Sequence, residues 1–250
     1  MVNTINTINE LTKTKMMNDI IHNEDCLVTM SKMEDNSVDL IVTSPPYNKG
    51  YWSSNRNMKN GFGTKFRRIE YDGYDDCMLP SDYDDWQRKI ITECLRVLKP
   101  TGSLFYNHQP IQKNHQEIFP KYIFDFPVKQ TIIWNRKNTP KLDKSYFFPV
   151  IEYIFWVQKT KDCRVKFNRK NSIFNKVIWD FNPDRDNKFP APFPIELPMN
   201  CILSCTDEND IVYDPFMGSG TTALACKQTN RRFIGSEVGD CEISEKRLEL

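Results

Sequence analysis

Short apolar runs rich in β-branched and aromatic residues recur at wide intervals along the chain, and segments with helical periodicity separate several of them. We predict strands at 19–22, 38–42, 103–106, 131–134, 151–157, 210–213 and 232–236. Two segments, 82–98 and 221–229, have the apolar spacing of helices, and the turn-forming sequence at 99–102 closes the first. Strands that alternate with helices predict a largely parallel α/β sheet.

Two stretches dense in turn-forming residues, 135–149 and 182–198, interrupt this alternation. The segment between them is expected to lie outside the regular alternation, as an inserted lobe. We therefore predict one domain over 19–250, preceded by a flexible arm over 1–18, with an insertion over 135–180.

The formal net charge of +1 conceals a strong asymmetry along the chain. Residues 129–176 hold twelve Lys and Arg against three Asp and Glu, whereas residues 180–250 hold seven against thirteen. A smaller stretch, 49–68, has six basic residues and no acidic residue. This distribution favours a surface that faces a polyanion, although a solvated lysine-rich face would have the same composition.

The eight cysteines include no C-x-x-C pair. Cys201 and Cys205 are four residues apart, on one face of a helix, but the chain has only three histidines and none is close to them in sequence. Reduced, buried thiols are expected rather than a metal site. No apolar run approaches the ~18 residues of a membrane span, and the first residues lack the apolar centre of a secretory signal. We expect a cytoplasmic protein with no membrane partner.

The first candidate site, Ser44-Pro45-Pro46-Tyr47, follows the predicted strand at 38–42. Each proline fixes φ near about −65° and restricts the residue before it to extended conformations, so the end of the strand is rigid. It presents the Ser44 hydroxyl, backbone carbonyls and the aromatic ring of Tyr47.

This arrangement suits reaction at the amino group of a nucleobase. That group is a poor nucleophile because its lone pair is delocalised, and two acceptors that hold both hydrogens out of the ring plane would stabilise the transition state. Tyr47 would stack on the base, which must first leave the duplex. A Pro-Pro turn that simply ends a strand is the alternative.

The second candidate site lies at 210–223, where a predicted strand, a glycine-rich turn and a helix start follow in order. Gly218, Gly220 and Ala223 match the G-x-G-x-x-A dinucleotide pattern, which brings backbone close to a ligand at a helix N-terminus. Glu237 ends the next predicted strand and is able to bind ribose hydroxyls. The pattern leaves NAD, a flavin and S-adenosylmethionine open, but the lack of a following Gly-Lys-Ser/Thr excludes a P-loop.

Together, Ser44–Tyr47 and Phe216–Gly220 resemble the D/N/S-P-P-Y/F/W catalytic motif and the F-x-G-x-G cofactor motif of DNA amino-methyltransferases, which modify cytosine N4 or adenine N6. The catalytic motif comes first, which resembles the circularly permuted β arrangement of that family. The resemblance covers roughly residues 20–248 and includes 23–26, 102–108 and 189–197, the last with Phe189 in place of the usual His.

This resemblance implies a Rossmann-like methyltransferase fold with a mostly parallel seven-stranded sheet and flanking helices. The insertion at 135–180 would be the target-recognition lobe. Ser44, the Pro45 carbonyl and Tyr47, with Pro46 between them, would engage the base. The residues implied to bind S-adenosylmethionine are Asp25 (adenine), Glu237 (ribose), Asp214 and the Gly218–Gly220 turn (methionine), with Cys26, Phe193, Pro194, Pro215, Phe216, Ser219 and Thr221 beside them.

The implied function is site-specific DNA methylation of a flipped base, without a metal, by a monomer or homodimer. A cognate restriction endonuclease is a further candidate partner. Ser44 resembles the cytosine-N4 enzymes, whereas Asn48 after the tyrosine also occurs among adenine-N6 enzymes, so adenine remains a close alternative. The candidate DNA-binding residues are Lys49, Arg56, Arg67, Arg68, Arg136, Lys137, Lys141 and Lys144.

Three other functions remain open from the sequence. A nicotinamide-dependent oxidoreductase would share the glycine-rich turn, but it gives no reason for Ser-Pro-Pro-Tyr or the basic stretch. A non-catalytic nucleic-acid-binding protein on a decayed fold would be expected to have degraded motifs. RNA or protein is also possible as the methyl acceptor, since any planar amino or amide group can be held in the same way.

Overall fold

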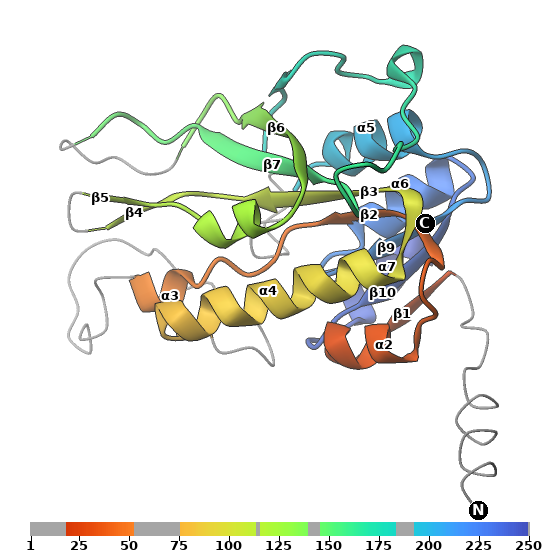
Figure 1. Ribbon diagram of the computed structural model, residues 1–250, viewed down its shortest axis with the longest axis horizontal. Helices are drawn as coiled ribbons and strands as arrows, with labels where there is room; N and C mark the ends of the chain where they lie inside the picture. The colour runs from red at the N-terminus through yellow and green to blue at the C-terminus, as the bar shows by residue number, and fades with distance from the viewer. Residues whose placement is uncertain (1–18, 53–75, 114–115, 140–145, 184–192, 250) are drawn as a thin grey trace, which may run out of the picture.

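The protein is described by a computed structural model that covers residues 19–52, 76–113, 116–139, 146–183 and 193–249. A mixed sheet lies between two layers of helices (Figure 1). Its strands are β1 (Ile20–His22), β2 (Val38–Thr43), β3 (Leu98–His108), β6 (Val128–Asn135), β7 (Ile151–Val157), β8 (Ile178–Asp180), β9 (Ile211–Asp214) and β10 (Arg232–Ser236). The helices are α2 (Cys26–Lys32), α3 (Lys49–Trp52), α4 (Pro80–Val97), α5 (Glu196–Cys205), α6 (Thr221–Gln228) and α7 (Glu242–Glu249). Smaller elements are the hairpin β4 (Ile111–Lys113) and β5 (Gln116–Ile118) and the 3-10 turns η1 (Lys121–Asp125) and η2 (Arg169–Asn171).

The main sheet has the strand order β1-β10-β9-β2-β3-β7-β6-β8. Five of its pairings are parallel, and only the two made by β7, with β3 and with β6, are antiparallel. The mostly parallel sheet and all seven predicted strands are confirmed. The eighth, β8, is absent from the prediction because three residues beside turn-forming sequence are too few to give a periodic signal. The last strands in sequence, β9 and β10, pair between β1 and β2, as a permuted order requires.

Helices cover both faces of the sheet, with α2 and α4 on one side and α5 and α6 on the other (Figure 1). The strand β2 is buried between them, so its two faces enter different cores. Ile41 packs in the cluster with α4, whereas Leu40 and Val42 pack in the cluster with α5 and α6. This two-sided burial explains why the strand reads as a continuous apolar run.

The two predicted helices are confirmed as α4 and α6, within two residues at each end. Proline occupies the first turn of α4, where its missing N–H costs no hydrogen bond. All eight cysteines are free thiols; Cys201 and Cys205 are buried on α5, and burial raises the pKa of Cys205 to about 11. Among the described residues, no three His, Cys, Asp or Glu side chains gather as metal ligands would. No helix in the described ranges is long and apolar enough to span a membrane.

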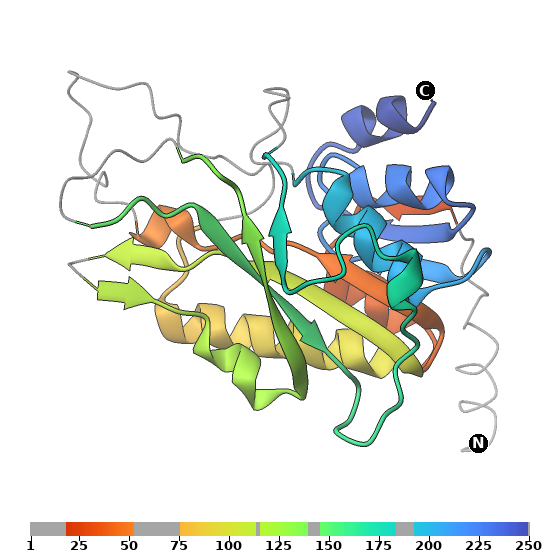
Figure 2. The ribbon, with the colours of Figure 1, turned by 90° about the horizontal axis from the view of Figure 1, so that it is seen from above.

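The region 135–180 contributes to the sheet as well as to its surroundings. Ile151–Val157 forms β7, next to β3 in the middle of the sheet, and the chain returns to the sheet edge at β8. A recognition surface in this region would therefore be built from the segments on either side of β7. In Figure 2 the hairpin of β4 and β5 lies at the opposite end of the molecule from α7. The expected arm at 1–18 lies outside the described residues.

Candidate functional site

The two sequence motifs meet at the carboxyl edge of the sheet. Strands β2 and β9 are parallel neighbours, and the first motif follows β2 while the glycine-rich turn follows β9. A side-chain hydrogen bond joins them, because Thr43 Oγ1 donates to Asp214 Oδ1 at 2.8 Å. The carboxyl edge of such a sheet is where ligands bind in doubly wound folds.

Asp214 is completely buried and organises the backbone around it. In addition to the bond from Thr43, its carboxylate accepts a hydrogen bond from the Phe216 amide at 3.0 Å and another from Thr222 Oγ1 at 2.6 Å. Burial raises the pKa of Asp214 to about 6, although these three donors act in the opposite direction. The carboxylate thus connects β2, the turn and the first residues of α6.

The turn between β9 and α6 depends on two glycines with positive φ, Gly218 at 50° and Gly220 at 76°. Glu237, which follows β10, accepts hydrogen bonds from the amides of Gly218 at 2.7 Å and Gly239 at 2.9 Å. Each of the two carboxylate oxygens accepts one of these bonds, so each oxygen can still accept a further hydrogen bond. The predicted ribose-binding acid therefore lies directly beside the predicted methionine-binding turn.

A cation from the last helix contacts the start of α6. Arg247 Nη1 lies 3.0 Å from Ser219 Oγ and 3.1 Å from Thr221 Oγ1, and these two hydroxyls are 3.1 Å apart. Both Ser219 and Thr221 are buried. These contacts therefore attach the glycine-rich turn to α7.

Asp25 caps α2, where its carboxylate accepts a hydrogen bond from the Leu27 amide at 2.8 Å. Nearby, Asn23 donates to the carbonyls of Glu237 at 2.9 Å and Gly239 at 2.6 Å. The structure therefore brings the segment around Asp25 next to the end of β10, as a common cofactor site requires.

The remaining predicted cofactor residues are largely packed within the protein. Phe216 contacts Trp86 of α4 with ring centroids 5.7 Å apart, and Phe193 packs against the cluster with α5 and α6. Burial raises the pKa of the Cys26 thiol well above its usual range. Buried residues in the predicted cofactor set also include Pro194 and Pro215.

The predicted catalytic motif, Ser44–Tyr47, is largely buried. Ser44 is half-buried, while Pro45, Pro46 and Tyr47 are buried. Tyr83 of α4 donates a hydrogen bond of 2.7 Å to the Pro46 carbonyl, which leaves the Ser44 and Pro45 groups as the candidate acceptors for a substrate.

The ring of Tyr47 lies against two nitrogen-containing side chains. The His108 ring centroid is 4.7 Å from that of Tyr47, and Nζ of Lys49 lies 4.7 Å from the same ring. Burial lowers the pKa of His108 to about 3, so this imidazole is neutral at ordinary pH. A base stacked on Tyr47 would require Lys49 to move if it used the face that the ammonium occupies.

Behind the motif lies a buried polar cluster that includes a carboxylate. Tyr47 Oη is 2.6 Å from Ser44 Oγ and donates to Glu152 Oε2 at 3.2 Å. Asn107 Nδ2 approaches Tyr47 Oη and Glu152 Oε2, both at 2.8 Å, and Ser44 Oγ at 3.3 Å. Arg136 Nη1 pairs with Glu152 Oε1 at 2.8 Å.

The predicted DNA-binding residues differ in where the structure places them. Lys137 is exposed, whereas Arg136 is mostly buried and turned inward toward Glu152. Lys49 lies over Tyr47. The other predicted DNA contacts, Arg56, Arg67, Arg68, Lys141 and Lys144, lie outside the described residues.

The sequence patterns do not single out Asn107, Glu152, Thr43, Thr222 or Arg247. The polar pair Asn107-His108, at the end of an apolar strand, offered a weak signal of a functional position. Glu152 offered another, as the one acid in the apolar run 151–157, although a single acid near the end of a strand is usually a solvated residue. Their contacts join residues far apart in sequence.

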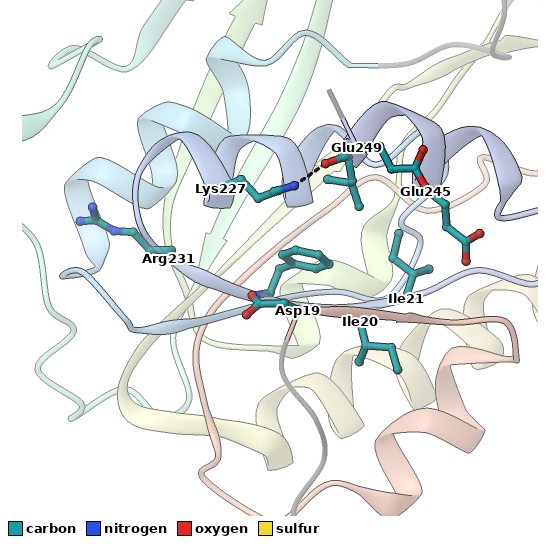
Figure 3. A pocket seen from close by; sticks show the side chains of 9 residues that line it. Asp19, Ile20, Ile21, Lys227, Arg231, Glu245 and Glu249 are labelled. Atoms are coloured by element: carbon teal, nitrogen blue, oxygen red, sulfur yellow. Dashed lines mark hydrogen bonds between the residues drawn. The ribbon is translucent and has the colours of Figure 1, made fainter.

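A cavity of about 560 Å³ lies elsewhere, lined by side chains from β1, β10, α6 and α7 (Figure 3). It is bordered by Asp19, Arg231 and Phe233, near the amino ends of β1 and β10. Because these strands are parallel to β2, the cavity lies at the edge of the sheet opposite to the two motifs.

Residues 38–246 match the model of a protein family described as DNA methylase, in the class of N6 and N4 methyltransferases. The type II methyltransferase M.BglII of Bacillus subtilis is 30% identical, over 87% of this chain and 65% of its own length. The DNA adenine methyltransferase YhdJ of Escherichia coli is 28% identical, over 88% of this chain and 78% of its own length. The chain spans under two thirds of the length of M.BglII, and 61% of M.BamHI of Bacillus amyloliquefaciens.

Solved structures share the fold. The PvuII cytosine-N4-specific DNA methyltransferase superposes with a TM-score of 0.69 at 19% identity, over 93% of this chain and 86% of its own. The complex of M1.HpyAVI with S-adenosylmethionine superposes with a TM-score of 0.60 at 26% identity, over 92% and 99%. The α/β methyltransferase fold is thus confirmed over nearly all of this chain.

Proposed function

The chain belongs to the DNA methylase family, and from this premise we propose that it transfers a methyl group from S-adenosylmethionine to the exocyclic amino group of a flipped DNA base. The observation that carries the proposal is the direct link between Thr43, beside Ser44-Pro45-Pro46-Tyr47, and Asp214, beside the glycine-rich turn. This link brings the proposed acceptors for the base amino group and the proposed cofactor-binding turn to one edge of the sheet. Family membership also decides against a nicotinamide-dependent oxidoreductase.

The residues at the turn fit the proposed cofactor. Gly218 is exposed, and a Cβ there would meet only the Phe216 carbonyl at 3.9 Å, so the backbone is open to a ligand. Glu237 is held by two amides and keeps acceptor capacity for a ribose diol. Asp25, on the adjoining segment, would face the adenine. The cofactor supplies an electrophilic methyl group on a sulfonium.

In this proposal the chain promotes transfer mainly by positioning and hydrogen bonding. Ser44 Oγ and the Pro45 carbonyl accept the two amino hydrogens and favour the pyramidal nitrogen of the transition state. Asp214 does not contact the base; its three bonds keep the end of β2 aligned with the turn. No residue has to remove a proton before transfer, because the amino nitrogen loses it after methylation.

Cytosine N4 is our preferred target. Ser44 is a neutral residue at the position where adenine-N6 enzymes usually have Asp, and the PvuII enzyme, a fold neighbour, is cytosine-N4-specific. Adenine N6 is the second candidate, since the similar YhdJ protein is named a DNA adenine methyltransferase. The partner would be DNA in the cytoplasm, and a cognate restriction endonuclease is proposed because several relatives are type II methyltransferases.

The test is to incubate the protein with methyl-labelled S-adenosylmethionine and mixed-sequence DNA, digest the DNA and identify the modified nucleoside. We expect N4-methylcytosine in wild type and none with Ser44→Ala, while the matched surface change Ser37→Ala retains transfer. N6-methyladenine alone would overturn the preference for cytosine. Parallel reactions receive RNA or unrelated protein in place of DNA, and label in either of these but not in DNA would overturn DNA as the acceptor.

A further inference from the structure

The buried carboxylate of Glu152 has no role in the function proposed so far. It lies at the start of β7 and is 6% exposed, in a strand otherwise occupied by apolar and aromatic residues. Burying an ion pair such as Glu152 with Arg136 is costly and seldom improves stability over apolar packing. Its other described partners are Tyr47 and Asn107, which both contact Ser44.

The direction of each hydrogen bond in this cluster follows from the chemistry of the groups. An ionised carboxylate can only accept, and a tyrosine hydroxyl has one hydrogen. Tyr47 must therefore direct that hydrogen to Glu152, 3.2 Å away. Its oxygen is then an acceptor, and Ser44 Oγ, 2.6 Å away, has to donate to it.

This ordering determines what Ser44 presents to a substrate. A serine hydroxyl both donates and accepts, and with its only hydrogen directed to Tyr47 it faces a ligand solely as an acceptor. We infer that Glu152 is a positioning residue that acts through the Tyr47 hydroxyl to hold Ser44 as an acceptor for the amino group of the target base. Asn107 contributes to the same ordering, because its Nδ2 has two hydrogens to donate and lies 2.8 Å from both Tyr47 Oη and Glu152 Oε2.

The inference rests on the proposed methyl transfer. It explains how a neutral serine can act purely as a hydrogen-bond acceptor at a position where a charged aspartate is usual. An amide at position 152 would reverse the order. Its NH2 would donate to Tyr47, Tyr47 would then donate to Ser44, and Ser44 would direct a hydrogen at the substrate amino group. That arrangement opposes the reaction without removing any group that touches the base.

The decisive measurement is steady-state methyl transfer to DNA by Glu152→Gln. We expect kcat to fall by roughly 10- to 100-fold, because misalignment of reacting groups lowers the rate on this scale, with KM for DNA and for S-adenosylmethionine changed less than about twofold. The matched control Glu208→Gln, an exposed acid in the turn before β9, should retain wild-type kcat. A wild-type kcat in Glu152→Gln would overturn the inference.

Two further variants separate positioning from a merely structural effect. Tyr47→Phe retains the ring and the Glu152–Arg136 pair but removes the hydroxyl, and should lower kcat to a similar extent even if Glu152→Gln does not fold. The double variant should be no slower than Tyr47→Phe alone, because both changes break one chain of bonds. Losses that multiply in the double variant would overturn the inference. Absence of transfer by wild type would instead overturn the proposed function, and this inference with it.

Discussion

Thr43 and Asp214 lie 171 positions apart in sequence, yet Thr43 Oγ1 donates a 2.8 Å hydrogen bond to the Asp214 carboxylate. Thr43 immediately precedes the Ser-Pro-Pro-Tyr motif, and Asp214 immediately precedes the segment that leads into the glycine-rich turn. This buried bond therefore joins the proposed base site directly to the proposed cofactor site, at the end of the paired strands β2 and β9.

Removing this bond should affect both stability and cofactor binding. Thr43→Val keeps the shape but deprives a buried carboxylate of one donor, so we expect the free energy of unfolding to fall by about 1–3 kcal/mol. Affinity for S-adenosylmethionine, measured by calorimetry, should also fall. Thr229→Val is the control, since it removes a part-buried hydroxyl bond at the far end of α6 and should leave cofactor affinity unchanged. Unaltered stability in Thr43→Val would show that the bond contributes little.

The two glycines of the turn should respond differently to alanine. Both have positive φ, so each substitution is expected to cost about 1–2 kcal/mol of backbone strain. At Gly220 the new Cβ would also approach Ser244 Cβ to 3.1 Å, whereas at Gly218 it would meet only the Phe216 carbonyl, at an ordinary contact distance of 3.9 Å. Urea unfolding should therefore rank Gly220→Ala as less stable than Gly218→Ala. The reverse order would contradict the close packing of α7 on the turn.

The pKa of Asp214 makes a signed prediction about pH. It is raised to about 6, above the roughly 3.9 of an unfolded chain, so the native state binds the proton more tightly. Stability from this group is fully present below about pH 4 and is lost as pH rises through about 6. Relative to Asp214→Asn, the free energy of unfolding of wild type should increase by about 2 kcal/mol as pH falls from about 6 to about 4.

The quantity to measure is the difference in free energy of unfolding between wild type and Asp214→Asn, by urea unfolding at several pH values. His108 has its pKa lowered to about 3 by burial, so it favours the native state above about pH 6.5 and this stability is lost as pH falls. The effect opposes that of Asp214 in wild type, but both proteins contain His108 and it cancels in the comparison. A difference that stays constant with pH would contradict the raised pKa of Asp214.

Adjacent cations at the end of β6 should have separate roles in DNA binding. Lys137 is exposed, so Lys137→Gln should lower the slope of log affinity against log salt by about 0.9 if its ammonium contacts one phosphate. Arg136 is paired with Glu152, so Arg136→Gln should leave that slope unchanged and lower kcat instead. Binding titrations at several salt concentrations check both. If Arg136→Gln, and not Lys137→Gln, reduced the slope of log affinity against log salt, Arg136 rather than Lys137 would be the DNA-contacting residue.

The sequence by itself determined the class of fold and the two ends of the site. Seven apolar runs predicted seven strands because burial on both faces requires continuous apolar sequence, and helical spacing predicted α4 and α6. Ser44–Tyr47 and Gly218–Gly220 were identifiable because prolines and glycines restrict or permit local backbone geometry wherever they occur. Such properties are local in the chain and can be read without contacts.

Only the tertiary structure decided which side chains meet. Arg136 is predicted from the sequence to bind DNA and Glu152 is not singled out, yet the antiparallel pairing of β7 with β3 and β6 brings the two together as a largely buried pair behind Tyr47. Asp214 is predicted from its motif to bind the cofactor, and only the structure shows that its three donors also make it a link between the two motifs. These relationships depend on strand order and register, which bring together residues separated by tens to hundreds of positions, and no local pattern encodes that pairing.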